Sequence, residues 1–171
     1  EQLNFAKKVL LSQLNGHFDQ VHYVGLGSIA QLSQYQPSQM VELITYTRQL
    51  FADKHLHVFG VGNSGAVISA KLGVDSVDTA SYLIDSRYGM VRDPRNLSMC
   101  VITTRSTSRP RITPRRLFAS CDCPPCQCGK AEIARWTREG FMLRAIHNAW
   151  MIRKLVREGR VHSRWARYLP T

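Results

Sequence analysis

Residues 55–80 read HLHVFGVGNSGAVISAKLGVDSVDTA, and this stretch decides the fold that the sequence predicts. Residues 55–62 form a short apolar run that ends in glycine, which is typical of a buried strand leading into a loop. Residues 64–73 predict a short helix closed by Gly73. Residues 74–80 predict a second strand, so the stretch is expected to fold as strand, helix and strand.

The preceding residues extend the same alternation. Residues 20–28, QVHYVGLGS, predict a strand, and residues 38–53 predict a helix with Ser38 as its N-cap. An earlier helix is predicted over residues 2–14, stopped by Asn15-Gly16. Strand, helix, strand, helix and strand in this order are typical of a parallel sheet with right-handed crossovers. The expected fold class is therefore α/β.

Glycine or polar residues follow all three predicted strands. In parallel sheets and (β/α)₈ barrels, the functional site lies at the C-terminal ends of the strands. Asp78 lies nearer that end than Asp75 and is the better candidate for chemistry, although an Asp there also commonly serves as a cap or hydrogen-bond anchor. Paired glycines after the first two strands allow close approach of a ligand, but no GxGxxG pattern supports a dinucleotide site.

The net charge of +11 is concentrated in the second half of the chain. Residues 1–85 hold 5 Lys and Arg against 7 Asp and Glu, a net of −2, whereas residues 86–171 hold 18 against 5, a net of +13. Nearly all of the second group are arginines, whose planar fork suits phosphates and base edges. A solvated basic surface is the plainer explanation, but this excess favours a nucleic-acid partner.

The rest of the sequence suggests three parts. Residues 1–89 are the predicted strand and helix region, residues 90–120 an Arg-rich connector with a small hairpin near MCVIT, and residues 121–171 a metal-binding subdomain. A helix is predicted over residues 130–158, interrupted or kinked at Gly140. Its buried stripe is expected to be Met142, Ile146, Ala149, Trp150 and Leu155.

Four of the five cysteines lie within CDCPPCQC, residues 121–128. Disulfides between such close neighbours would be strained, so a bound metal and a reducing compartment are favoured. A CxCxxC loop can turn three sulfurs to one side, and the later helix offers His147 as the fourth ligand; Cys128 is the alternative. With four protein ligands the ion would be a structural Zn²⁺. The expected ligands are Cys121, Cys123, Cys126 and His147.

Composition argues against a membrane protein. No run of about eighteen apolar residues is present, and the first residues lack the basic and apolar segments of a signal peptide. Together with the reduced cysteines, these features predict a cytoplasmic protein.

Three stretches resemble the queuine/archaeosine tRNA-guanine transglycosylase superfamily, which exchanges guanine in nucleic acid for a 7-deazaguanine base. They are residues 57–89, the zinc-like pattern CDCPPC with the distant His147-Asn148, and YVGLGS at residues 23–28. The resemblance implies a part of a (β/α)₈ TIM-like barrel, its last strands and helices, with a zinc-binding subdomain. It further implies that the remaining half-barrel comes from the same protein, a partner chain or a second copy.

The resemblance also implies roles for individual residues. Asp78 would be the nucleophile that forms a covalent glycosyl-enzyme. Gly25, Leu26 and Gly62 would contact the base, and Arg87 would contact phosphates. The substrate would be tRNA or, as in the DNA-modifying branch of the superfamily, DNA. The alternative is a non-catalytic, zinc-containing subunit or module that binds nucleic acid.

Overall fold

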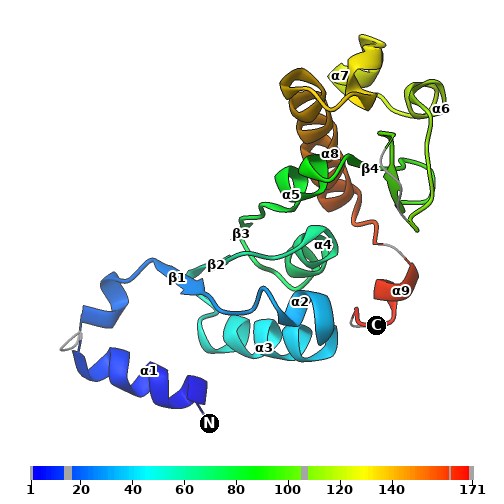
Figure 1. The fold of residues 1–171 in the computed structure, drawn as a ribbon. Coiled ribbons are helices and arrows are strands. Elements are labelled where there is room, and N and C mark those ends of the chain that lie inside the picture. Colours follow the sequence, from blue (N-terminus) through cyan, green and yellow to red (C-terminus); the bar gives the residue numbers. More distant parts are fainter. Residues whose placement is uncertain (1, 14–16, 105–107, 162, 170–171) are drawn as a thin grey trace.

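The computed structural model describes residues 2–13, 17–104, 108–161 and 163–169, which form the mixed α/β arrangement of Figure 1. The predicted stop at Asn15-Gly16 lies outside the described residues. The strands are β1 (Tyr23–Leu26), β2 (His55–Val58), β3 (Ser76–Val77), β4 (Met90–Arg92) and β5 (Met99–Val101). The α-helices are α1 (Gln2–Gln13), α2 (Leu32–Tyr35), α3 (Pro37–Leu50), α4 (Asn63–Lys71), α5 (Ser81–Arg87), α6 (Pro114–Phe118), α7 (Pro124–Gln127), α8 (Arg138–Glu158) and α9 (Ser163–Ala166), with 3₁₀ turns η1 (His17–Gln20) and η2 (Ala131–Ala134).

Strands β1, β2 and β3 form a parallel sheet in that order. Helix α3 connects the first pair and α4 the second, as the alternating pattern predicts. Leu26 pairs with Val58, and Val58 pairs with Val77, so the three strands end at the same edge. The predicted α/β fold with a parallel sheet is therefore confirmed.

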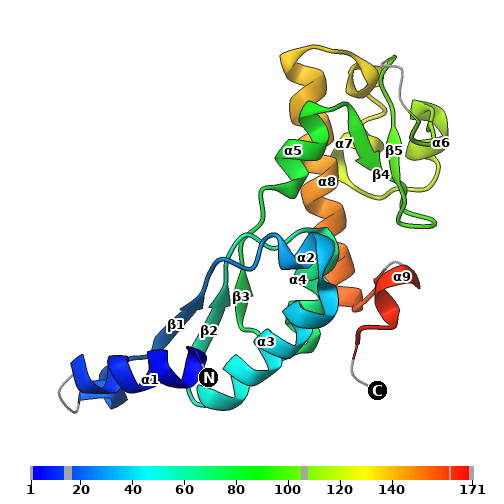
Figure 2. The same cartoon turned by 60° about the horizontal axis from the view of Figure 1, so that its bottom comes forward.

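The two faces of this sheet differ sharply. Leu56 and Val58 are completely buried in a core that also contains Met40 and Ile44 of α3. Because side chains alternate along a strand, His55 and His57 lie on the other face, where they are half-buried. Figure 2 shows the helices α3 and α4 gathered on one side of the three strands.

A second core forms around the cysteine loop. The antiparallel hairpin of β4 and β5, helices α6 and α7, and one side of α8 enclose it. Met151 and Leu155 of α8 belong to this second core, whereas Ile152 belongs to the core beneath the sheet. Helix α8 therefore joins the two parts, and Figures 1 and 2 show it extending from α7 towards α4.

The predicted course of the last long helix was partly wrong. Helix α8 starts at Arg138 with Thr137 as its cap, and Gly140 lies in its first turn. A Cβ atom at Gly140 would lie only 2.4 Å from the carbonyl oxygen of Arg135, so close packing explains this glycine. Three members of the predicted buried stripe, Met142, Ile146 and Trp150, are exposed instead. Leu155 is buried as predicted, and the buried side also includes three polar residues, Arg144, His147 and Asn148.

Within the described residues, no helix combines the length and the apolar character needed to span a membrane.

Candidate metal centre and strand-edge site

The structure brings Cys121, Cys123, Cys126 and His147 into one buried cluster. The Nδ1 atom of His147 lies 3.5, 3.3 and 3.6 Å from the Sγ atoms of Cys121, Cys123 and Cys126, respectively. All four ligand atoms lie within 4.8 Å of one another, and the cluster can hold a metal ion. Cys128, the alternative ligand, is exposed and is not part of the cluster.

The local sequence explains how the loop gathers its sulfurs. Pro124 and Pro125 begin helix α7, where proline is favoured because it has no N–H to satisfy. The carbonyl of Cys123 accepts a hydrogen bond from the amide of Gln127 at 3.0 Å, which closes a tight turn. This turn directs the side chains of Cys123 and Cys126 inward, whereas Cys128 lies beyond it and points to solvent.

His147 is held by a hydrogen bond on its other nitrogen. Its Nε2 atom lies 2.9 Å from the carbonyl oxygen of Arg92 in β4. A carbonyl can only accept, so Nε2 carries a proton, and Nδ1 is the nitrogen that faces the three sulfurs, where a metal ion would displace any proton that Nδ1 carries. Metal-binding histidines are typically oriented in this way by a second partner. The residue is fully buried, which fixes the ring further.

The cluster also shifts the pKa values of its members. Hydrogen bonds from Cys123 and Cys126 lower the pKa of the Cys121 thiol far below its ordinary value. Burial lowers the pKa of His147, but hydrogen bonds with the Cys121 and Cys123 sulfurs outweigh it and raise the pKa to about 9. The thiolate is the form of cysteine that binds a metal ion, so the lowered pKa of Cys121 keeps this residue in its metal-binding form.

Two further polar side chains of α8 hydrogen-bond to the backbone segments around the Cys₃His cluster. The guanidinium of Arg144 donates to the carbonyl oxygens of Ser86, Ile133 and Arg135 at 2.8–2.9 Å. The amide of Asn148 accepts from the backbone N–H of Arg92 and donates to the carbonyl of Met90, each at 3.1 Å. These bonds fasten α5, η2 and β4 to α8, and β4 in turn supplies the carbonyl that orients His147.

Asp78 lies just after β3, at the edge where the three strands end. One of its carboxylate oxygens, Oδ1, accepts a hydrogen bond of 2.7 Å from the backbone N–H of Gly60, which follows β2. The same oxygen lies 3.6 Å from Nε2 of His57, and the Asp78 side chain is 60% exposed. Asp75 is engaged differently, because it accepts from the backbone of Leu56 and from Arg48, both at 2.8 Å. Asp75 is thus an anchor, while Asp78 is accessible.

The predicted base-contacting residues lie at the same edge. Gly25 pairs with His57 in the sheet, and a Cβ there would lie 2.7 Å from the exposed ring of Phe59, so a larger residue would have to displace that ring. The Leu26 side chain is buried in the core, and its carbonyl accepts from the amide of Phe59 at 3.0 Å. Only its backbone is therefore placed to meet a ligand. Gly62 is the N-cap of α4.

Arg87, the predicted phosphate contact, is exposed in the last turn of α5. In both Figure 1 and Figure 2, α5 separates the strand edge at β3 from helix α7, which carries Cys126. The structure therefore does not bring the Cys₃His cluster to Asp78, and a metal ion in the cluster would act on the fold and not on this carboxylate.

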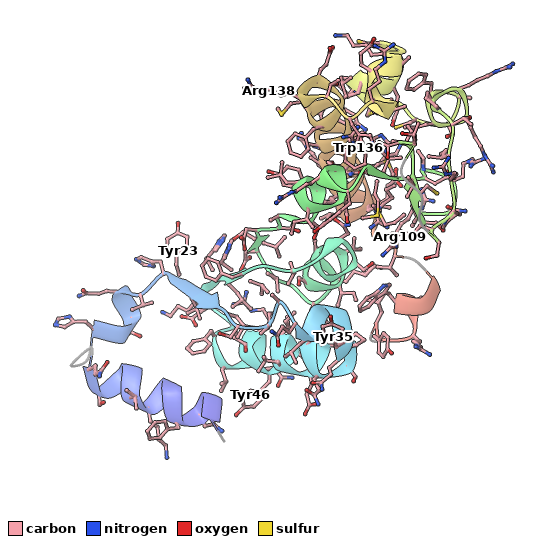
Figure 3. All side chains as sticks on the ribbon, in the orientation of Figure 1. Tyr23, Tyr35, Tyr46, Arg109, Trp136 and Arg138 are labelled. Carbon is pink, nitrogen blue, oxygen red and sulfur yellow. The ribbon has the colours of Figure 1, made fainter. Side chains whose placement is uncertain are left out.

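Sequence reasoning missed a row of polar side chains beside Asp78. The Ser76 hydroxyl lies 2.8 Å from Nε2 of His55 and 2.8 Å from Nδ1 of His57. The rings of Tyr23 and Phe59 flank this row, and Figure 3 shows Tyr23 projecting from β1 on the side away from α3. The alternation His-x-His in a predicted strand could have revealed it, because alternate residues share a face.

A comparison with protein-family models identifies one match, to the family described as queuine tRNA-ribosyltransferase, over residues 8–164. Neither the curated proteins nor the solved structures include a significant match. The match covers most of the chain, and the family implies a glycosyl transferase that acts on guanine in nucleic acid. It also agrees with the parallel sheet and the Cys₃His cluster described above. The chain therefore belongs to the queuine tRNA-ribosyltransferase family of tRNA-guanine transglycosylases.

Proposed function

We propose that this chain carries the nucleophile of a transglycosylase that replaces guanine in nucleic acid with a 7-deazaguanine base. The observation that carries the proposal is the position of Asp78. Its carboxylate is exposed at the C-terminal edge of a parallel sheet, the edge where such folds bind their substrates. A backbone N–H holds one carboxylate oxygen and leaves the other available to attack.

The chemistry uses one carboxylate oxygen of Asp78 in both steps. The available oxygen bonds to C1′ of the target nucleoside while the bond from C1′ to the base breaks, and the base leaves with the bonding electrons. The sugar is then held as an ester of Asp78. The incoming base then attacks C1′ through a ring nitrogen that gives up its proton, and the ester C–O bond breaks with its electrons restoring the carboxylate. Over the two steps the departing base gains the one proton that the entering base loses. A carboxylate suits this exchange because the transition state has oxocarbenium character, as in retaining glycosidases. The target base must be turned out of any stack to reach it.

Gly25, Leu26 and Gly62 would contact the base, and Arg87 would contact phosphates. The absence of a side chain at Gly25 leaves room for the ring of Phe59 beside this position. Arg87 is exposed on α5, the helix that directly follows Asp78. The excess of arginine in residues 86–171 supports a polyanionic partner, which would be tRNA or DNA.

We infer that Zn²⁺ occupies the Cys₃His cluster. In a tetrahedral site with Zn–S of about 2.3 Å and Zn–N of about 2.0 Å, sulfur and nitrogen lie roughly 3.5 Å apart. The distances from Nδ1 of His147 to the three sulfurs, 3.3–3.6 Å, agree with this geometry. Zinc held by four protein ligands has a structural role, which here would be to fix the α8 and β4 region.

The parallel sheet would be part of a (β/α)₈ TIM-like barrel. Among the strands that the structure describes, β1 and β3 each pair on one side only, and the face that bears His55 and His57 has no covering helix layer. Closing a barrel would satisfy both edges and enclose that face. The additional strands would come from the same polypeptide, a partner chain or a second copy. Native mass spectrometry of the assembly, with zinc counted on the same sample, tests this. One zinc in a stable lone monomer that consists of these 171 residues alone would contradict it.

The function itself is tested by guanine exchange. The native assembly is incubated with tRNA or with DNA, and incorporation of labelled guanine is followed for the wild type, for Asp78→Asn and for the matched control Asp75→Asn. We expect incorporation into one nucleic acid by the wild type and the control, and none by Asp78→Asn. Nucleic-acid binding without any exchange would instead favour the alternative, a non-catalytic zinc-containing subunit or module.

A further inference from the structure

The uncovered face of the parallel sheet carries a hydrogen-bonded row, His55–Ser76–His57, whose last ring lies beside Asp78. Nε2 of His55 lies 2.8 Å from Oγ of Ser76, and the same Oγ lies 2.8 Å from Nδ1 of His57. Nε2 of His57 then lies 3.6 Å from Oδ1 of Asp78. The four side chains come from two adjacent strands, at positions that alternate along each strand and so share one face.

A single hydroxyl between two imidazoles fixes the direction of these bonds. Ser76 has one proton to donate, so it donates to one ring and accepts from the other. If Ser76 donated to His55, a neutral His57 would carry its proton on Nδ1 and turn a bare lone pair towards the Asp78 carboxylate, which is repulsive. If Ser76 donates to Nδ1 of His57, the proton of His57 is on Nε2 and faces the carboxylate, which is attractive.

We infer that His57 is a positioning residue for Asp78, with its Nε2–H directed at Oδ1 by the hydroxyl of Ser76 and by His55 behind it. Together with the N–H of Gly60, His57 would hold Oδ1 as the passive oxygen of the nucleophile. The other oxygen would then be the atom that bonds to C1′. This inference rests on the proposed function, because only a nucleophilic Asp78 needs its carboxylate oriented. The arrangement of His55, Ser76 and His57 beside Asp78 does not depend on that function.

The arrangement favours the covalent intermediate as well as the free carboxylate. When the other oxygen becomes esterified, Oδ1 becomes the carbonyl oxygen of that ester, still accepts from the N–H of Gly60 and still faces the Nε2–H of His57. No proton moves in this step, so His57 keeps its Nε2–H throughout. A pair of fixed donors restricts rotation of the carboxyl group and keeps the attacking oxygen in line with C1′.

The first test does not depend on activity. Long-range ¹H–¹⁵N correlation spectra of histidine-labelled protein report which ring nitrogen carries the proton, and the signals of His57 are assigned by their loss in His57→Gln. We expect the neutral ring of His57 to be protonated on Nε2, with signals that change in both Ser76→Ala and Asp78→Ala. His55 should respond more strongly to Ser76→Ala. A proton on Nδ1 of His57, or His57 signals that are unchanged in Asp78→Ala, would overturn the inference.

The second test separates positioning from simple folding. His57→Leu should slow formation of the covalent adduct on the order of 100-fold while leaving nucleic-acid affinity unchanged. His57→Gln should restore much of the rate, because its amide nitrogen can donate where Nε2 does, and His22→Leu, an exposed histidine before β1, should match the wild type. A wild-type rate in His57→Leu would overturn the inference. Absence of any adduct in the wild type would instead refute the proposed function, and the spectra would still decide the role of His57.

Discussion

Replacing Arg144 by methionine should destabilise the protein substantially, because this buried guanidinium holds three backbone segments together. The side chain is 1% exposed, and it donates to the carbonyls of Ser86, Ile133 and Arg135 at 2.8–2.9 Å. Methionine fills a similar volume but cannot donate. Each buried carbonyl that loses its hydrogen-bond donor lowers the free energy of unfolding by about 1–3 kcal/mol. Removal of the buried charge offsets part of the sum over the three carbonyls, so we expect a net loss of about 3 kcal/mol.

Urea titration followed by circular dichroism measures this loss, and a thermal scan should show a decrease in Tm of roughly 6–12 °C. The matched control is Arg153→Met, an exposed arginine on the same helix, which should stay within about 0.5 kcal/mol of the wild type. If Arg144→Met were as stable as this control, Arg144 would not be the anchor that its three hydrogen bonds indicate.

Three other predictions concern the metal cluster, a packed glycine and acid stability. Cys123→Ser should lose the bound zinc in elemental analysis, whereas Cys128→Ser should keep it; equal zinc contents in the two variants would contradict the ligand set. Gly140→Ala should lower the free energy of unfolding by about 1–3 kcal/mol, because a Cβ there would overlap the carbonyl of Arg135. The pKa of Asp75 is lowered, first by the hydrogen bond from the backbone of Leu56. Its stabilising contribution is thus present above the ordinary value of 3.8 and is lost as pH falls through the lowered pKa, so Asp75→Asn should flatten the acid limb of the stability profile.

Much of the sheet could be predicted from local pattern. Short apolar runs that end in glycine mark β1 and β2, and the helical segments between strands require crossovers, so order and parallel pairing follow. Two-residue periodicity also separates the core side of β2 from the side that bears His57. Local pattern does not reveal whether further strands pair with β1 and β3, because pairing across a sheet edge joins residues far apart in sequence.

The buried side of α8 could not be predicted from hydrophobic periodicity. Trp150 and Ile146 are apolar but exposed, whereas Arg144, His147 and Asn148 are polar and buried. These polar residues are buried because each finds partners on β4, α5 or η2, and such partners are set by tertiary structure. Helical periodicity identifies an apolar stripe only where burial is driven by apolar contacts.

The residues of the Cys₃His cluster could be predicted from the chemistry of their side chains, whereas hydrophobic periodicity gave no sign of them. Three thiols in a tight loop need a fourth ligand at a distance, and His147 is in place to provide it. The row beside Asp78 was missed because its residues are ordinary strand residues, two histidines and a serine, whose proximity depends on the register of β2 against β3.

The central claim is that Asp78 forms a covalent bond to the sugar of its nucleic-acid substrate. The most direct measurement is to denature a reaction of the native assembly and detect protein that remains linked to nucleic acid, with zinc counted in parallel. We predict an adduct with the wild type and with Asp75→Asn, and no adduct with Asp78→Asn although its zinc content is unchanged. An adduct that persists in Asp78→Asn would contradict the assignment of the nucleophile.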